Sequence, residues 1–147
     1  MISVLVDTNV VLDVLLDRQP HASHSVALWA HVESGRMRGF LSAHSVTTIH
    51  YLLRREMGET RTRKVLTSLL SVFAVAPVDG HVLVEALTST SPDFEDAVTA
   101  AAARRAQCSF IVTRDPRGYK GSIVKAVAPA TANAFVSAKA TISGDTT

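Results

Sequence analysis

Several acidic residues stand where carboxylates could act together. Asp7 directly follows the apolar run Ile2–Val6, and Asp115 comes two residues after a second apolar run. If both runs are strands of a parallel sheet, their carboxyl ends meet at the edge where such sheets bind ligands. Asp93 and Asp96 lie three residues apart at the start of a predicted helix and share one of its faces. These carboxylates are candidates for a single site.

Carboxylates gathered at one site repel each other unless a positive charge lies among them. Mg²⁺ and Mn²⁺ prefer oxygen ligands and accept a few carboxylates, completed by water and by phosphate oxygens of a substrate. Such an ion lowers the pKa of a bound water and neutralises charge that builds on a phosphoryl group, in a one-metal or two-metal arrangement. The pattern therefore predicts metal-assisted hydrolysis of a phosphodiester.

Each acid also has a structural explanation. Asp93 could cap a helix, and Glu95 and Asp96 could favour the positive end of the helix dipole. Asp115 precedes a proline and is typical of a turn. Asp7 is harder to explain in this way, because turn chemistry does not require an acid directly after an apolar strand. The joint pattern, more than any one residue, favours a site.

The hydrophobic pattern predicts strands that alternate with helices. Apolar runs predict strands at 2–6, 39–42, 72–76, 109–113 and 123–127. Helices are predicted after residue 8 and at 21–33, 46–58, 60–71, 82–87, 91–105 and 131–138, with Ser91 as cap and Pro92 in the first turn of the sixth. Because this alternation implies parallel pairing, the predicted fold class is α/β: a three-layer α/β/α sandwich around a mainly parallel sheet of about five strands.

Composition indicates one globular domain. The chain has 147 residues, of which 47% are hydrophobic and 19% charged, which excludes wholesale disorder. We predict a domain at 1–139 and a flexible polar tail at 140–147. The net charge of +2 does not by itself indicate a polyanionic partner; the basic segment 54–64 either contacts phosphates or is a solvated helix face.

Cysteine content and hydropathy bear on the compartment. The single cysteine, Cys108, cannot form an internal disulfide, which fits a reducing environment. No apolar run approaches the roughly 18 residues of a membrane span, so we expect no membrane association and a cytoplasmic location.

The six histidines lack an acidic or cysteine partner nearby in sequence and are interpreted as surface or packing residues. Arg114 could contact a substrate phosphate or pair with a site carboxylate, and both remain open.

The acidic segments resemble the motifs of a known family. The segment 4–10, Val-Leu-Val-Asp-Thr-Asn-Val, resembles the opening of PIN domains. The segments 93–97, Asp-Phe-Glu-Asp-Ala, and 111–115, Ile-Val-Thr-Arg-Asp, resemble their central and last acidic motifs. The order and spacing also match, and the resemblance extends from residue 2 to about residue 135.

The resemblance implies an Mg²⁺- or Mn²⁺-dependent ribonuclease, often a VapC-type toxin held inactive by a small antitoxin, and often a homodimer. Water would attack phosphorus in line and leave a 5′-phosphate and a 3′-hydroxyl. By position, the expected metal ligands and catalytic residues are Asp7, Asp96 and Asp115. Asp93 would be an auxiliary acid, and Asn9 and Thr113 would orient the site through hydrogen bonds. Further auxiliary residues around the site would be Glu95, Thr48 and Arg114.

The chain departs from the family pattern at one position. Many members carry a glutamate in the helix after the second strand, where this chain has Thr48 in a stretch without an acid. A hydroxyl is a weaker, neutral ligand, so the loss of one negative charge should weaken metal binding. The protein would then need more metal, depend on Asp93 or Glu95, or be catalytically poor.

Competing functions therefore follow from the sequence. The leading hypothesis is a ribonuclease toxin, and the alternative is a PIN-like module that has lost turnover and holds RNA or protein. Metal-dependent cleavage separates the two. A phosphatase with Asp7 as nucleophile would require an acid two residues later, where Asn9 stands.

Overall fold

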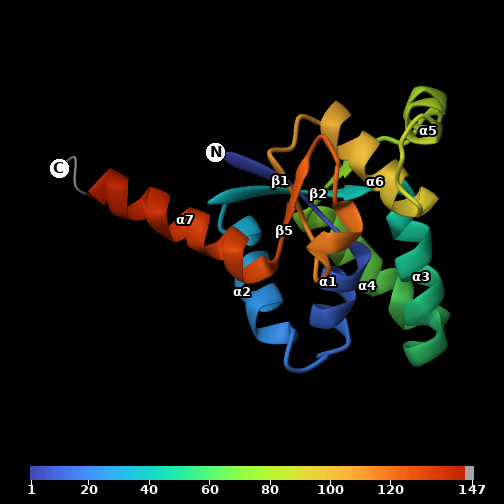
Figure 1. The fold of residues 1–147 in the computed structure, drawn as a ribbon. Coiled ribbons are helices and arrows are strands. Elements are labelled where there is room, and N and C mark those ends of the chain that lie inside the picture. Colours follow the sequence, from blue (N-terminus) through green and yellow to red (C-terminus); the bar gives the residue numbers. More distant parts are fainter. Residues whose placement is uncertain (145–147) are drawn as a thin grey trace.

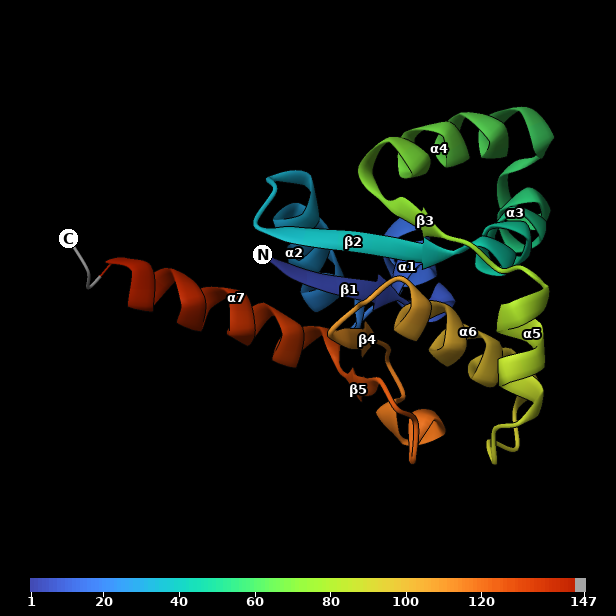
Figure 2. The same ribbon diagram turned by 90° about the horizontal axis from the view of Figure 1, so that it is seen from above.

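The computed structural model describes the backbone of residues 1–144 and the side chains of residues 1–137. Within them a sheet of five strands has the order β3-β2-β1-β4-β5, and every neighbouring pair is parallel (Figures 1 and 2). The strands are β1 (Ile2–Val6), β2 (Met37–Ser42), β3 (Ala74–Ala76), β4 (Phe110–Val112) and β5 (Lys125–Val127). The strand alternation read from the sequence is confirmed, and β1 lies at the centre of the sheet.

Helices connect the strands and cover both faces of the sheet. They are α1 (Thr8–Leu15), α2 (Ala22–Glu33), α3 (Ala43–Met57), α4 (Glu59–Val72), α5 (Gly80–Leu87), α6 (Phe94–Arg105), the 3₁₀ helix η1 (Pro116–Tyr119) and α7 (Pro129–Gly144). None of them, in the part of the chain that the structure describes, has the length and hydropathy needed to cross a membrane.

The core has two halves, one on each side of the sheet. Successive side chains of a strand point to opposite faces, so Val4 and Val6 pack with α1, α2, α3, α4 and α7, whereas Leu5 packs with α5 and α6. All three side chains are at most 1% exposed. Such continuous burial is expected of a parallel strand covered on both faces. The predicted three-layer α/β/α sandwich is confirmed.

The start of α6 differs from the prediction. Asp93, not Ser91, caps this helix: the Asp93 carboxylate accepts a hydrogen bond of 3.1 Å from the backbone N of Asp96. Ser91 Oγ instead bonds the backbone N and carbonyl of Asp93, and Pro92 precedes the helix. The cap is thus two residues later than predicted, and the helix begins at Phe94.

The final helix is longer than predicted. It runs from Pro129 to Gly144, rather than over 131–138, and both ribbon views show it extending away from the sheet. A proline in the first turn costs no hydrogen bond, so the helix begins there. Residues 140–144 of the predicted tail continue this helix, and residues 145–147 lie outside the described residues. The flexibility of 140–147 and the domain boundary at 139 stay predictions.

Candidate active site

Asp7 is held at the carboxyl end of the central strand. Its backbone N donates to the carbonyl of Val112, 2.9 Å away, which joins the ends of β1 and β4. Its carboxylate accepts hydrogen bonds from Thr8 N at 2.8 Å, from Thr113 Oγ1 at 3.0 Å and from Tyr119 OH at 3.0 Å. The first bond caps α1, and the other two end on the same oxygen, Oδ2. The carboxylate is therefore fixed in one orientation.

Thr113 connects the segment after β4 to the start of α1. Its hydroxyl is buried, donates to Asp7, and accepts from Asn9 Nδ2 and from the backbone N of Asp115, each at 3.3 Å. Asn9 Oδ1 in turn accepts from the backbone N of Arg114 at 3.2 Å. Asn9 and Thr113 thus lie where an orienting role requires them, and the role itself stays a prediction.

Asp96 reaches the same edge from the first turn of α6. The pKa of its half-buried carboxyl is raised from 3.8 to about 6, first by burial and then by the negative charges of Asp93 and Asp7. Glu95, which is exposed, adds a smaller effect of the same sign. The structure therefore brings together carboxylates that are 89 positions apart in the chain, one directly after β1 and the other on α6, and their repulsion contributes to the raised pKa of Asp96.

Tyr119, which the sequence did not point to, links these two carboxylates. Its buried hydroxyl donates to Asp7, and Asp96 lies close enough to hydrogen-bond with it. Burial and the charges of Asp7 and Asp96 raise the pKa of Tyr119 far above its usual range, so the hydroxyl keeps its proton and remains a donor. The residue before it packs closely on the site: a Cβ at Gly118 would lie 3.1 Å from Asp96 Oδ2, so a larger residue would displace that carboxylate by a few tenths of an ångström.

Asp115 and Arg114 follow β4 but make different contacts. Asp115 is exposed. Its backbone N donates to Thr113 Oγ1 and its carbonyl accepts from the backbone N of Gly118, so the role of its carboxylate as a metal ligand stays a prediction. Arg114 pairs with an acid outside the site: its Nε lies 3.3 Å from Oδ2 of Asp13, a carboxylate of α1 that is 1% exposed. Asp13 also faces Arg18 at 3.9 Å. Arg114 is thus paired with a carboxylate of α1, and its expected contact with a substrate phosphate stays a prediction.

The start of α3 carries His44 and Thr48, which lie one turn apart on one helix face. His44 is half-buried; burial lowers the pKa of its imidazole, against the opposing effects of Glu95 and Asp7. Its Nδ1 shares a hydrogen bond of 2.5 Å with Ser42 Oγ, and its buried Nε2 has no hydrogen-bond partner among the described residues. The half-burial of His44 agrees with its interpretation as a packing residue, and its imidazole also lies within electrostatic reach of Glu95 and Asp7.

The carboxylates suit a divalent ion that is only partly held by protein. Among the residues that the structure describes, no three His, Cys, Asp or Glu side chains are placed to hold a metal ion by themselves. Mg²⁺, however, is usually bound by one or two carboxylates and completed by waters and substrate phosphates. Asp7 and Asp96 are oxygen donors whose mutual repulsion a cation would relieve. The residues present therefore fit Mg²⁺ or Mn²⁺ in a site completed by water and substrate.

Comparison with known proteins adds a family and a set of similar folds. A family model described as PIN domain matches residues 3–117. Solved structures that are similar include FitAcB from Neisseria gonorrhoeae, with 22% identity, a TM-score of 0.64, and 86% of this chain and 97% of that chain covered. A toxin–antitoxin complex from Klebsiella pneumoniae has 20% identity, a TM-score of 0.64 and coverage of 86% and 97%.

A VapC toxin from Mycobacterium tuberculosis, described as cleaving the sarcin–ricin loop, has 20% identity, a TM-score of 0.65 and coverage of 82% and 96%. No protein of curated function matches the chain. At these identities the likeness to solved structures shows the fold.

Proposed function

Because the chain belongs to the PIN domain family, we propose that it is a metal-dependent ribonuclease and the toxin of a toxin–antitoxin pair. One observation carries the proposal. Asp7 and Asp96 meet at the carboxyl edge of the sheet, where burial and like charges raise the pKa of Asp96 to about 6. A divalent cation at these carboxylates would relieve that repulsion, and phosphodiester hydrolysis is the chemistry such a site performs.

We assign the residues of the site two roles, holding the ion and orienting its ligands. Asp7 and Asp96 would hold the ion, with Asp115 as the third ligand expected from the family motif. When bound, Mg²⁺ or Mn²⁺ supplies an acidified water and neutralises charge on the phosphate. Thr113 and Tyr119 both donate to Oδ2 of Asp7 at 3.0 Å and prevent the carboxylate from rotating.

Thr48 favours a second candidate function, a PIN-like module that binds RNA or protein and turns over slowly or not at all. The acid common in the family is replaced by a neutral hydroxyl. One turn earlier on the same helix face, His44 offers an imidazole whose pKa is lowered by burial and which adds no negative charge. The site therefore has fewer anionic ligands than the family pattern, which would raise the metal concentration needed for activity.

The decisive experiment is cleavage of a structured RNA by the purified protein with Mn²⁺ or Mg²⁺. We expect cleavage with either ion and none in EDTA, and we expect Asp96→Asn to abolish it while the variant remains folded by circular dichroism. Glu56→Gln is the matched control, because it neutralises an exposed carboxylate of α3. Undiminished cleavage by Asp96→Asn would refute the role of Asp96. A folded wild type that retains RNA without cutting it would favour the second candidate.

The proposal includes partners and a location. We infer a small antitoxin protein that inhibits the enzyme, a homodimer of this chain, and a cytoplasmic site of action. Two of the similar structures are described as a toxin–antitoxin complex and as a toxin, which supports the antitoxin partner. Co-expression with the product of a small neighbouring gene should give a stable complex that no longer cleaves RNA. Light scattering of the free chain should give a dimer mass, and a monomer mass would refute the homodimer.

A further inference from the structure

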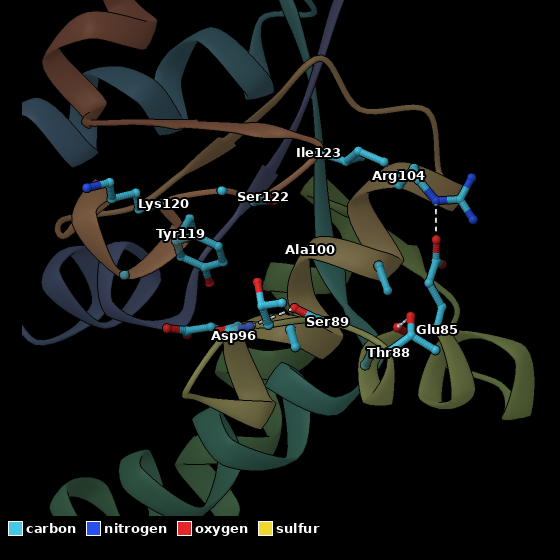
Figure 3. Close-up of a pocket in the computed structure, with 17 residues that line it drawn as sticks. Glu85, Thr88, Ser89, Asp96, Ala100, Arg104, Tyr119, Lys120, Ser122 and Ile123 are labelled. Atoms are coloured by element: carbon cyan, nitrogen blue, oxygen red, sulfur yellow. Dashed lines mark hydrogen bonds and ion pairs between the residues drawn. The ribbon is translucent and has the colours of Figure 1, made fainter.

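A cavity of about 320 Å³ adjoins the carboxylates. It lies between α6, the segment 85–91 at the end of α5, and the segment 118–123, which begins in the last turn of η1 (Figure 3). Asp96 and Tyr119 lie at one end of the cavity, and Ile123 and Arg104 lie at the other. Because Asp96 and Tyr119 also belong to the carboxylate site, a ligand in the cavity would be directly beside that site.

Small side chains create the space. Ala97, Ala100 and Ala101 of α6 form one wall, at the spacing that places residues on one helix face. Ile123 stands at the rim with 82% of its surface exposed, which is a large exposed area for an aliphatic side chain. A volume near the lower limit of ligand pockets, about 300–1,000 Å³, suits one small ring system and excludes a helix.

Hydroxyl groups surround this apolar wall. The lining includes Ser89 and Ser91 on one side and Ser122 on the other. Ser122 Oγ is buried and has no hydrogen-bond partner among the described residues. Burying a hydroxyl without a partner is unfavourable, and a ligand with donors and acceptors on its edge would satisfy it. An apolar face with polar groups at the edge is the chemistry of a nucleobase.

Charge argues against an acidic occupant. The charged residues of the lining balance, with Glu85 and Asp96 against Arg104 and Lys120. Arg104 is already paired with Glu85 through its Nε. An acidic peptide side chain entering the cavity would meet Asp96, whereas a neutral base would bring no negative charge.

We propose that the cavity is a nucleobase subsite, which receives one unpaired base of the RNA and thereby places the neighbouring phosphodiester at Asp7 and Asp96. The inference rests on the proposed ribonuclease function and adds how the substrate is held. Ala100 lies four residues after Asp96, about 6 Å along the helix axis at 1.5 Å per residue. The base and the reacting phosphate would therefore be one nucleotide apart. Extruded, unstacked bases are the usual targets of RNA recognition.

Methyl NMR of the full chain in EDTA tests base binding without catalysis. The protein carries labelled Ala and Ile methyl groups and is titrated with each of the four ribonucleoside 5′-monophosphates. We expect at least one nucleotide to shift the methyls of Ala100, Ala101 and Ile123. Ribose 5-phosphate, which has the sugar and phosphate but no base, should leave them unchanged. Equal shifts with ribose 5-phosphate, or no shifts with any nucleotide, would overturn the proposal.

Substitutions in the cavity sharpen the test. Ala100→Leu fills the space and should weaken nucleotide binding about tenfold, whereas Ala27→Leu, at an exposed position of α2, should not. Ser122→Ala preserves the space, removes the hydroxyl, and should weaken binding about threefold to tenfold; unchanged binding by both cavity variants would overturn the subsite. RNA cleavage with no base binding would refute the subsite alone. Base binding by a chain that cleaves no RNA would refute the ribonuclease and preserve the subsite.

Discussion

Replacing Asp96 by Asn should stabilise the metal-free protein at neutral and alkaline pH. The pKa of Asp96 is raised in the folded protein from 3.8 to about 6, by burial and then by Asp93 and Asp7. A carboxyl whose pKa is higher in the folded state favours folding when it is protonated. Its contribution is complete below pH 3.8 and is lost as the pH rises through 6. Above pH 6 the wild type therefore carries a cost that the neutral amide avoids.

The size of the effect follows from the shift. A pKa shift of about two units corresponds to a free energy of about 3 kcal/mol, at 1.36 kcal/mol per pKa unit. Because Asp96 is only half-buried, solvent screening reduces this to about 1–2 kcal/mol. For a chain of this length about 2–4 °C of Tm accompany each kcal/mol. We expect Asp96→Asn to raise the Tm by about 2–8 °C at pH 8 in EDTA, and the gain to shrink between pH 6 and pH 4.

Thermal melts with and without metal complete the test. Mg²⁺ or Mn²⁺ at 100 times its Kd should stabilise the wild type by about 2.7 kcal/mol, and Asp96→Asn should gain much less, so the order of the two proteins reverses. Glu56→Gln should behave as the wild type in both buffers. A lower Tm for Asp96→Asn at pH 8 in EDTA would refute the repulsion, and equal stabilisation of both proteins by metal would refute the role of Asp96 as a ligand.

Further predictions concern metal affinity and packing. Thr48→Glu should tighten metal binding in calorimetry about tenfold; unchanged affinity would place Thr48 outside the site. Arg114→Ala removes the shorter ion pair of the buried Asp13 and should cost about 1–3 kcal/mol in urea unfolding, which Asp13→Asn in the same chain should partly restore. Gly39→Ala puts a Cβ 2.7 Å from the Phe73 ring and should cost about 1–3 kcal/mol; wild-type stability would show that the ring moves freely.

The sheet and the position of Asp7 could be predicted because both depend on local patterns. Continuous apolar runs predict strands buried on both faces, and their alternation with helices implies parallel pairing. Parallel pairing then places Asp7 after β1 and Asp115 after β4 at one edge. The element boundaries were less accurate, because a cap such as Asp93 competes with Ser91 two residues away and the sequence does not show which one the chain uses.

Tyr119 and His44 could not be found in this way. Tyr119 lies 112 positions after Asp7, on a short 3₁₀ helix in a segment whose composition is typical of a loop. Hydrophobic periodicity does not reveal the path of a loop, so nothing in the sequence brings this hydroxyl to Asp7. His44 precedes the expected acid position by one helical turn and has no partner nearby in sequence. Its proximity to Asp7 and Glu95 arises only when β2 and α6 come together in the fold.

The charge balance of the site also depends on a contact that sequence does not show. Arg114 is adjacent to Asp115, yet its guanidinium pairs with the buried Asp13, whose other ion-pair partner, Arg18, lies further away at 3.9 Å. Every charged side chain that acts on Asp96 is itself an acid, namely Asp93, Asp7 or Glu95. The nearby His44 has a pKa lowered by burial and brings little positive charge at neutral pH. The groups that act on the pKa of Asp96 by charge are thus negative, and a divalent cation from solution would offset them.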